Sequence, residues 1–426
     1  MPDETSAGST RSSRATLRLR TRVALILAGV ALGLAAGEVV ARLVGFEFRP
    51  HMRNRVYFAQ PDPLLGWRNR PGVAGPYGGD EFLTWVTINP AGQRGPLHPV
   101  ERVPGRRRIA FLGDSQTWGD GVADNQTFVA RLDGGDTEAL SFSCPGWGTD
   151  QQLLALRSDA QRYRPDVVVL ATFVGNDLRD NTSRGTFQYP KPYFTVQDDG
   201  SLRLEGVPVP YSRAMHALIE GYRAVMRRSA VLNAIAEISR KDWSVRSASA
   251  VQPSVALAQS VYTAELSPED AQRLDLTVRL MREVARETRA IGAEPVVLII
   301  PELWQVEVYN DRELRRRLQE SGADFRRPQR VLRAAMEADG IEVIDALPAL
   351  ARASRRLARA GQHTYYPQWR HLNANGHAVL ARLLASRLGV KHRRARAASD
   401  DAADAAPSPP PGSPASQTAP SNPSRS

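Results

Sequence analysis

Short apolar runs alternate with longer stretches of helical periodicity between about residue 109 and residue 390. Two of these runs, at 166–171 and 295–300, are almost continuously apolar, as strands buried on both faces of a sheet must be. The alternation predicts an α/β fold in which helices cover a parallel sheet. The expected strands span 109–112, 139–143, 166–173, 294–300 and 341–345, and the expected helices span 126–132, 150–163, 268–291, 311–339 and 373–388.

The amino end has a different pattern, with basic residues followed by a long apolar run. Five arginines lie between residues 11 and 22, and the run at 23–37 carries no charge before Glu38, Arg42 and further apolar residues. This order predicts a membrane anchor at 23–46, a cytoplasmic basic arm at 1–22 and an extracytoplasmic remainder. Two alternatives are a signal peptide cleaved near the small residues at 33–37 and a buried helix of a soluble protein.

Three further stretches fall outside the alternation. Residues 47–107 are rich in Pro, Gly and Arg, which predicts a spacer or leader that packs on the catalytic domain. Residues 181–262 form an insertion in the domain at 108–390, and the tail at 391–426 is expected to be disordered. Within the insertion, six residues follow helical spacing and predict a packing face: Met215, Leu218, Ile219, Tyr222, Val225 and Met226.

Composition narrows the classes of partner and cofactor. The 426 residues carry a net charge of +11, part of it in the two ends, but show no dense basic stripe with interleaved aromatic residues, so no nucleic-acid partner is expected. The single cysteine, Cys144, excludes an intramolecular disulfide and a cysteine-built metal site. We expect neither a metal nor another cofactor. Cys144 is interpreted as a small buried residue that fills space in the core.

Candidate catalytic residues follow the expected strands. Ser115 lies in the turn Gly113-Asp114-Ser115 directly after the first strand, where an open sheet binds ligands. Polar loops follow the second and third strands, and a late loop holds His371. Acyl transfer needs a nucleophile, a base and fixed donors for the oxyanion. We assign Ser115 as nucleophile, His371 as base, and the backbone N–H groups of Ser115 and Gly146 with the Asn176 amide as oxyanion donors.

Each assignment has a simpler alternative. Gly146 and Asn176 are both common in ordinary turns. His363 is a rival for the base, whereas His377, on the expected last helix, is interpreted as structural. Asp114 is expected to brace the turn rather than to take part in catalysis.

On the basis of these turns and loops, the chain resembles the SGNH (GDSL-type) hydrolase superfamily, whose members share four conserved sequence blocks. Gly113-Asp114-Ser115, Gly146, Gly175-Asn176-Asp177 and His371 resemble its four blocks, in the family's order. Short sequence segments at 62–67, 89–95, 191–194 and 208–210 resemble those of a membrane-anchored branch of this superfamily. The resemblance implies a three-layer α/β/α, flavodoxin-like domain with a five-stranded parallel sheet that hydrolyses or transfers acyl groups, commonly on carbohydrates or small esters, without a metal.

The chain departs from this family at two places. Gln116 follows the nucleophile where the family often has an aliphatic or aromatic residue, a change that should be tolerated. The family also has an aspartate two or three residues before the histidine, and here those positions hold Trp369 and Gln368. A backbone carbonyl or another carboxylate could hold His371, the site could work as a Ser–His dyad, or catalysis could be degraded. Asp345, which ends the fifth expected strand, is more simply a capping residue.

Three functions are compatible with the sequence. The first is an extracytoplasmic serine esterase that acts on acetyl or other short-chain esters of small molecules or carbohydrates. The second is an O-acyltransferase that modifies envelope glycans with the same acyl-enzyme, and the third is a glycan-binding protein of weakened catalysis.

Overall fold

Five parallel strands form the central sheet of this protein. The computed structural model describes residues 7–44, 55–79, 81–186, 189–232, 234–235, 261–263 and 265–390. The strands are β5 (Arg107–Gly113), β6 (Thr137–Ser143), β7 (Val167–Phe173), β12 (Glu294–Ile300) and β13 (Glu342–Asp345), in the spatial order β13-β12-β7-β5-β6. Counted along the chain, this is the doubly wound order 2-1-3-4-5 of flavodoxin-like folds. The predicted fold class is confirmed.

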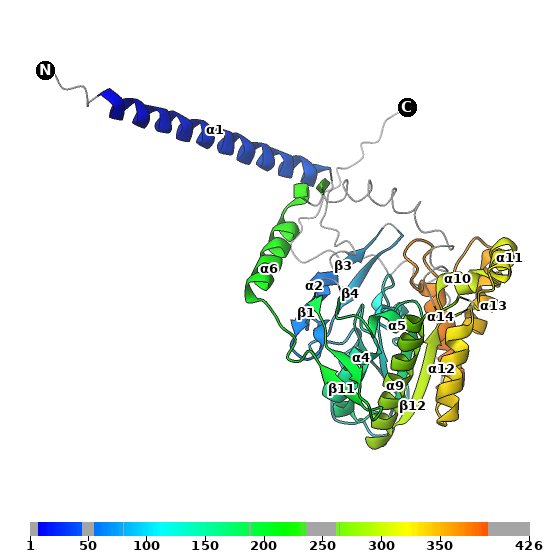
Figure 1. Ribbon diagram of the computed structural model, residues 1–426. Coiled ribbons are helices and arrows are strands. Elements are labelled where there is room, and N and C mark those ends of the chain that lie inside the picture. Colours follow the sequence, from blue (N-terminus) through cyan, green and yellow to red (C-terminus); the bar gives the residue numbers. More distant parts are fainter. Residues whose placement is uncertain are drawn as a thin grey trace, which may run out of the picture.

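Helices cover both faces of the sheet (Figure 1). On one face, α4 (Thr149–Ser158), α9 (Pro268–Ala290) and α12 (Arg327–Ala338) share an apolar core with Ala110 and Leu112 of β5. On the other, α13 (Leu347–Ala358) and α14 (Ala374–Leu388) share a second core with Ile109 and Phe111. Because successive strand residues point to opposite faces, both faces need apolar residues, which explains the continuous apolar runs.

Three helix predictions differ from the structure. Residues 126–132 do not form a helix: a short 3₁₀ turn, η2 (Asp124–Gln126), is followed by turns, and Phe128 N donates to the ring of His377. The expected helix at 311–339 is two helices, α11 (Arg312–Glu320) and α12, separated at Gly322, whose φ of +66° ends the first. The helix expected at 150–163 ends at Ser158 and gives way to η3 (Ala160–Tyr163).

The leader, residues 55–107, folds against the domain. A short helix, α2 (Arg55–Phe58), precedes two hairpins, β1 (Ala59–Asp62) with β2 (Gly66–Asn69) and β3 (Ala74–Gly78) with β4 (Leu83–Thr87). Phe58 and Tyr77 form an apolar cluster with Trp118, which belongs to the helix that begins at the candidate nucleophile. The leader is therefore packed directly beside the candidate site.

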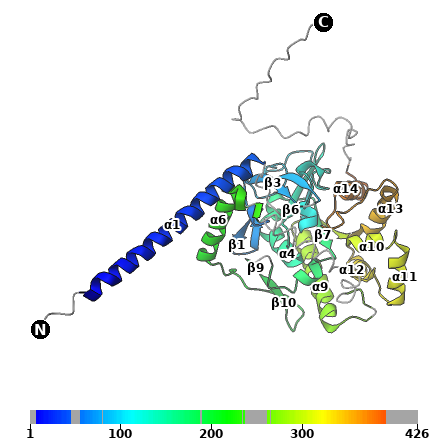
Figure 2. The ribbon, with the colours of Figure 1, turned by 90° about the horizontal axis from the view of Figure 1, so that it is seen from above.

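The insertion holds strands β8 (Gly185–Thr186), β9 (Tyr189–Pro190), β10 (Tyr193–Val196) and β11 (Leu202–Glu205) and the helix α6 (Arg213–Arg228). Further short helices are α3 (Ser115–Trp118), α5 (Asp177–Asp180) and α10 (Leu303–Glu307). At the amino end, α1 (Ala7–Leu43) projects away from the body (Figures 1 and 2). Its segment Arg20–Leu43, which contains an 18-residue window with a mean hydropathy of 2.3, is long and apolar enough to cross a membrane. The tail at 391–426 lies outside the described residues, as do parts of the arm, leader and insertion.

Candidate active site

Ser115 lies at the carboxyl end of β5, as the first residue of α3. The carboxylate of Asp114 caps this short helix by accepting a hydrogen bond from Gln116 N at 2.9 Å, so Asp114 braces the turn. A Cβ atom at Gly113 would lie 2.1 Å from the Thr117 hydroxyl oxygen, so only glycine fits before the turn. The turn holds the Ser115 side chain in a buried position at the edge where the sheet can receive a ligand.

His371 contacts the serine directly. Its Nε2 atom lies 2.8 Å from Ser115 Oγ, and its Nδ1 atom lies 2.9 Å from the carbonyl oxygen of Trp369. A carbonyl can only accept, so in the neutral ring Nδ1 carries the proton and the lone pair of Nε2 faces the serine hydroxyl. The structure thus brings together the two side chains assigned as nucleophile and base, in the tautomer that a base requires.

The histidine loop is held to the nucleophile turn. Leu372 N donates to Gln116 Oε1 at 3.1 Å, and the indole ring of Trp369 stacks on the His371 imidazole with centroids 5.0 Å apart and planes at 24°. The unusual residue after the nucleophile, Gln116, therefore links the two loops that supply Ser115 and His371.

Asp120 supplies the carboxylate that the sequence did not reveal. This fully buried residue places Oδ2 3.9 Å from His371 Nε2, while its Oδ1 accepts hydrogen bonds from Tyr77 Oη at 2.8 Å and Trp369 Nε1 at 3.1 Å. It lies only five residues after Ser115 in the chain, and that proximity was the available signal. Asp345, the acid considered earlier, instead accepts from Leu347 N at 2.9 Å and caps α13.

The two remaining oxyanion candidates follow the strands on either side of β5. Gly146 follows β6 and has a φ of +81°, a conformation that favours glycine. Asn176 follows β7, and its Nδ2 donates to Asp180 Oδ2 at 2.8 Å. Within the described residues, no hydrogen bond joins either of them to Ser115, although both loops open at the same edge of the sheet.

Buried ionisable groups near the site have strongly shifted pKa values. Burial, together with the neighbouring carboxylates of Asp114 and Asp180, raises the pKa of Asp177 well above its usual range. Burial also lowers the pKa of His377 to about 3, and nearby arginines act in the same direction. His377 therefore stays neutral and accepts a hydrogen bond from Phe128 N, which supports its structural interpretation, while the side chain of His363 is exposed to solvent.

The leader fixes the loop that carries Asp120. The buried guanidinium of Arg94 donates to the carbonyl oxygens of Trp118, Gly119 and Val122 and pairs with Asp124 at 2.8 Å. This one side chain therefore holds the chain on both sides of Asp120.

Other leader residues hold the neighbouring loops. Glu81 Oε2 accepts from the backbone N–H groups of Gln368 and Trp369, at 3.0 and 2.6 Å. Trp67 Nε1 donates to Pro145 O at 3.0 Å, directly before Gly146. The leader thus contacts the histidine loop and the glycine loop as well as the loop of Asp120, a role that its composition did not indicate.

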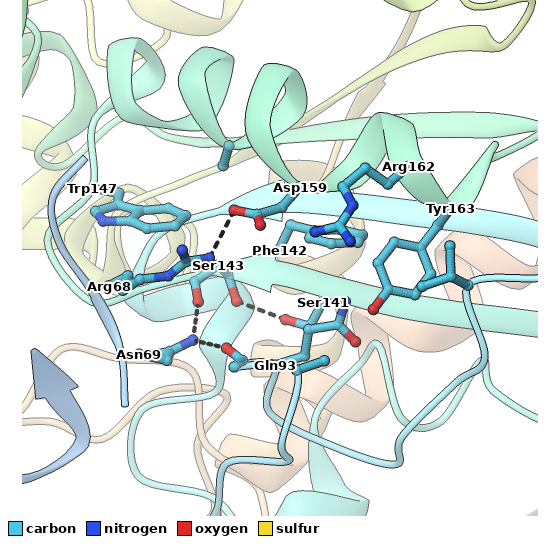
Figure 3. Close-up of a pocket in the computed structure, with 14 residues that line it drawn as sticks. Arg68, Asn69, Gln93, Ser141, Phe142, Ser143, Trp147, Asp159, Arg162 and Tyr163 are labelled. Atoms are coloured by element: carbon cyan, nitrogen blue, oxygen red, sulfur yellow. Dashed lines mark hydrogen bonds and ion pairs between the residues drawn. The ribbon is translucent and has the colours of Figure 1, made fainter. Parts of the chain in front are cut away.

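A cavity of about 250 Å³ lies between the leader, β6 and η3 (Figure 3). Ser115 and His371 do not line it. Its polar groups bond largely to one another: Arg68 pairs with Asp159 at 2.8 Å, Asn69 donates to Ser143 O at 2.9 Å, and the Ser141 and Ser143 hydroxyls are 2.7 Å apart. The bonds of Arg68 and Asn69 hold the leader to the end of α4 and to β6, so we do not place the reaction here. Among the described residues, no group of three or more His, Cys, Asp and Glu side chains is arranged to hold a metal ion.

Several solved structures to which the chain is similar are described as esterases or acylhydrolases. An acetyl xylan esterase shares 12% identity and a TM-score of 0.37, with 66% of this chain and 99% of that chain covered. An acetylxylan esterase from Geobacillus stearothermophilus, solved as a catalytic mutant, shares 12% identity and a TM-score of 0.35 over 70% of this chain and 100% of that one. A lipase/acylhydrolase from Enterococcus faecalis shares 12% identity and a TM-score of 0.32 over 68% and 100%.

No protein-family model matches the chain, and no curated protein sequence matches it. The structural overlaps are partial, so the chemistry below is argued from the site itself. The fold and the site define a flavodoxin-like α/β protein with a serine–histidine pair at the carboxyl ends of its strands.

Proposed function

We propose that this protein is a membrane-anchored, extracytoplasmic serine esterase of SGNH type that hydrolyses short-chain acyl esters of small molecules or carbohydrates. The observation that carries the proposal is the 2.8 Å contact between Ser115 Oγ and His371 Nε2, with Nδ1 facing a carbonyl oxygen. A serine whose hydroxyl faces the free lone pair of a neutral imidazole is poised for deprotonation during attack.

In the first half of the reaction, Ser115 Oγ attacks the ester carbonyl carbon while His371 Nε2 takes the hydroxyl proton. The carbonyl oxygen becomes an oxyanion, for which Ser115 N–H, Gly146 N–H and the second amide hydrogen of Asn176 are the proposed donors. The bond to the leaving oxygen then breaks, and the imidazolium returns its proton to that oxygen. An acyl-enzyme on Ser115 and a free alcohol result.

The second half repeats these steps with water. His371 takes a proton from water as the water oxygen attacks the acyl carbon, and then returns the proton to Ser115 Oγ as the acyl bond breaks. The charged imidazolium forms twice per turnover. The Asp120 carboxylate at 3.9 Å and the stacked face of Trp369 both favour that charge.

The extracytoplasmic location is part of the proposal and comes from the amino end. The apolar segment Arg20–Leu43 supports an anchor, and the arginines that precede it favour a cytoplasmic amino terminus. The catalytic domain then lies outside the cytoplasm.

The test uses the full chain in detergent with a short-chain aryl acetate. We expect Ser115→Ala to lower kcat by at least ~10³-fold, since the acyl-enzyme cannot form. Ser201→Ala, an exposed serine in the β10–β11 turn, is the matched control and should keep full activity. A serine-directed phosphonate should add its mass to Ser115 in the wild type and in the control, and not in Ser115→Ala.

Full activity in Ser115→Ala would overturn the assignment. Absence of both turnover and phosphonate capture in the wild type would favour the glycan-binding alternative. Analysis of the products with acceptor glycans separates an esterase from an acyltransferase, because a sugar hydroxyl would then replace water in the second half-reaction.

A further inference from the structure

The helix α6 turns an apolar stripe away from the protein. Leu218, Tyr222 and Val225 are 67%, 56% and 53% exposed. Because successive residues of a helix are 100° apart, these three side chains lie within about 60° of one another around the axis. The sequence predicted a packing face for these residues, and no side chain in the described part of the chain buries them.

The opposite side of α6 faces the body. Glu220 pairs with Arg70 of the leader at 3.4 Å. By the same helical geometry, Glu220 lies roughly opposite the middle of the apolar stripe. The orientation of the helix about its axis therefore exposes the stripe, because the polar contact with the leader holds the other side.

The carboxyl end of α6 is joined to the end of α1. Arg42 Nη2 donates to Arg228 O at 2.8 Å, and the Glu38 carboxylate accepts from Ser229 Oγ at 3.0 Å and from Ala230 N at 2.9 Å. Both views show α6 against the end of α1, on the side of the body from which α1 projects (Figures 1 and 2). If α1 crosses a bilayer, the bilayer surface passes close to this junction, because the apolar span ends there.

We propose that α6 lies in the interface of the membrane that α1 spans, with Leu218, Tyr222 and Val225 inserted between the headgroups. The stripe belongs to a helix whose carboxyl end is joined to the end of the apolar span, so it adjoins the segment that would cross the bilayer, and an apolar stripe opposite a polar side is the pattern of an interfacial helix. Tyrosine is also favoured at this depth. α1 and α6 together give the bilayer two contacts with the protein, which fix the orientation of the catalytic domain. This inference depends on the membrane anchor of the proposed function.

The test uses the full chain in nanodiscs of phosphatidylcholine and phosphatidylglycerol, with a bilayer-quenched fluorophore on single cysteines. Cys144 is fully buried, so an exposed introduced cysteine should be labelled selectively, and the unsubstituted chain checks this. Labels at Leu218→Cys and Tyr222→Cys should be quenched several-fold by brominated lipids. The matched control is Leu97→Cys, since the Leu97 side chain is also exposed, at 58%. Leu97 lies in the loop that holds Pro99, whose carbonyl oxygen accepts a hydrogen bond from Arg108 at the amino end of β5.

A fourth label, at Val30→Cys in α1, reports the anchor itself. Quenching at positions 30, 218 and 222 but not at 97 supports the inference. Quenching at 30 with none at 218 and 222 overturns it and leaves the anchor in place. A label at 218 that is shielded from a soluble quencher and insensitive to brominated lipid also overturns it, because a protein would then cover the stripe. No quenching at 30 would overturn the anchor and, with it, this inference.

Discussion

The Nδ1 atom of His371 lies 2.9 Å from the carbonyl oxygen of Trp369, the residue at one of the two positions where the resemblance expects an aspartate. A carbonyl fixes the tautomer and the orientation of the ring as an aspartate would, but it brings no full negative charge. That charge comes from Asp120, on the Nε2 side of the ring. The two tasks of the expected acid are thus divided between a backbone group and a side chain from another loop.

Asp120→Asn should remove the negative charge beside His371 while keeping the hydrogen bonds that Asp120 accepts. The asparagine oxygen can still accept from Tyr77 and Trp369, while the unit charge near His371 is lost. At about 4 Å such a charge is worth about 1–4 kcal/mol, so we expect kcat to fall by a factor between about 5 and about 900. The acidic limb of the kcat/KM profile should move to lower pH, because a nearby carboxylate favours the protonated ring. Profiles with an aryl acetate measure both effects.

Asp198→Asn, in the exposed turn after β10, is the control for a lost carboxylate and should match the wild type. If Asp120→Asn kept the wild-type rate and pH profile, Asp120 would have no part in the reaction.

Lys191→Met should destabilise the insertion's attachment to the domain. Lys191 Nζ lies 2.6 Å from Asp150 Oδ2 and 2.7 Å from Asp180 O, and both charged side chains are fully buried. Removing one partner of a buried pair typically costs about 3–5 kcal/mol. Burial raises the pKa of Asp150 and the neighbouring lysine acts in the opposite direction, so loss of the lysine would raise that pKa further. Denaturant unfolding of the full chain in detergent measures the loss.

The double variant Lys191→Met, Asp150→Asn should recover part of that stability, since no unpaired carboxyl is then buried. Arg316→Met, which breaks an exposed pair with Glu313, should change stability little. Equal effects of the buried and exposed substitutions would contradict this account.

His377 should make the protein less stable in acid. Its pKa is about 3 in the folded protein and near 6.5 in the unfolded chain, so the unfolded state binds the proton first. The contribution to stability is complete above pH 6.5 and is lost as the pH falls toward 3, by up to about 1.4 kcal/mol per pH unit. His377→Asn cannot titrate but can still accept from Phe128 N. Its unfolding free energy should therefore depend less on pH over this range, and an unchanged dependence would show that another group is responsible.

Much of the fold could be predicted from the sequence because burial on both faces leaves a local pattern. The runs around Val169 and Leu298 are apolar throughout, and they form strands within a residue or two of the predicted ends. One helix error has a local cause that periodicity does not record. Gly322, with a positive φ, breaks one long pattern into α11 and α12.

For the site, the sequence by itself indicated the nucleophile turn and the glycine and asparagine loops, because each follows a strand whose end is readable from its pattern, and it indicated the late histidine by its place in the loop before the last helix. The sequence left a backbone carbonyl and another carboxylate both open as partners of the histidine, and only the tertiary structure decided between them: the carbonyl of Trp369 lies in the histidine's own loop, and the carboxylate of Asp120 reaches the ring from a separate loop. It also decided the part played by the leader, whose residues Tyr77, Glu81 and Arg94 contact those loops. Contacts between segments far apart in the chain leave no periodicity, so no local pattern could show them.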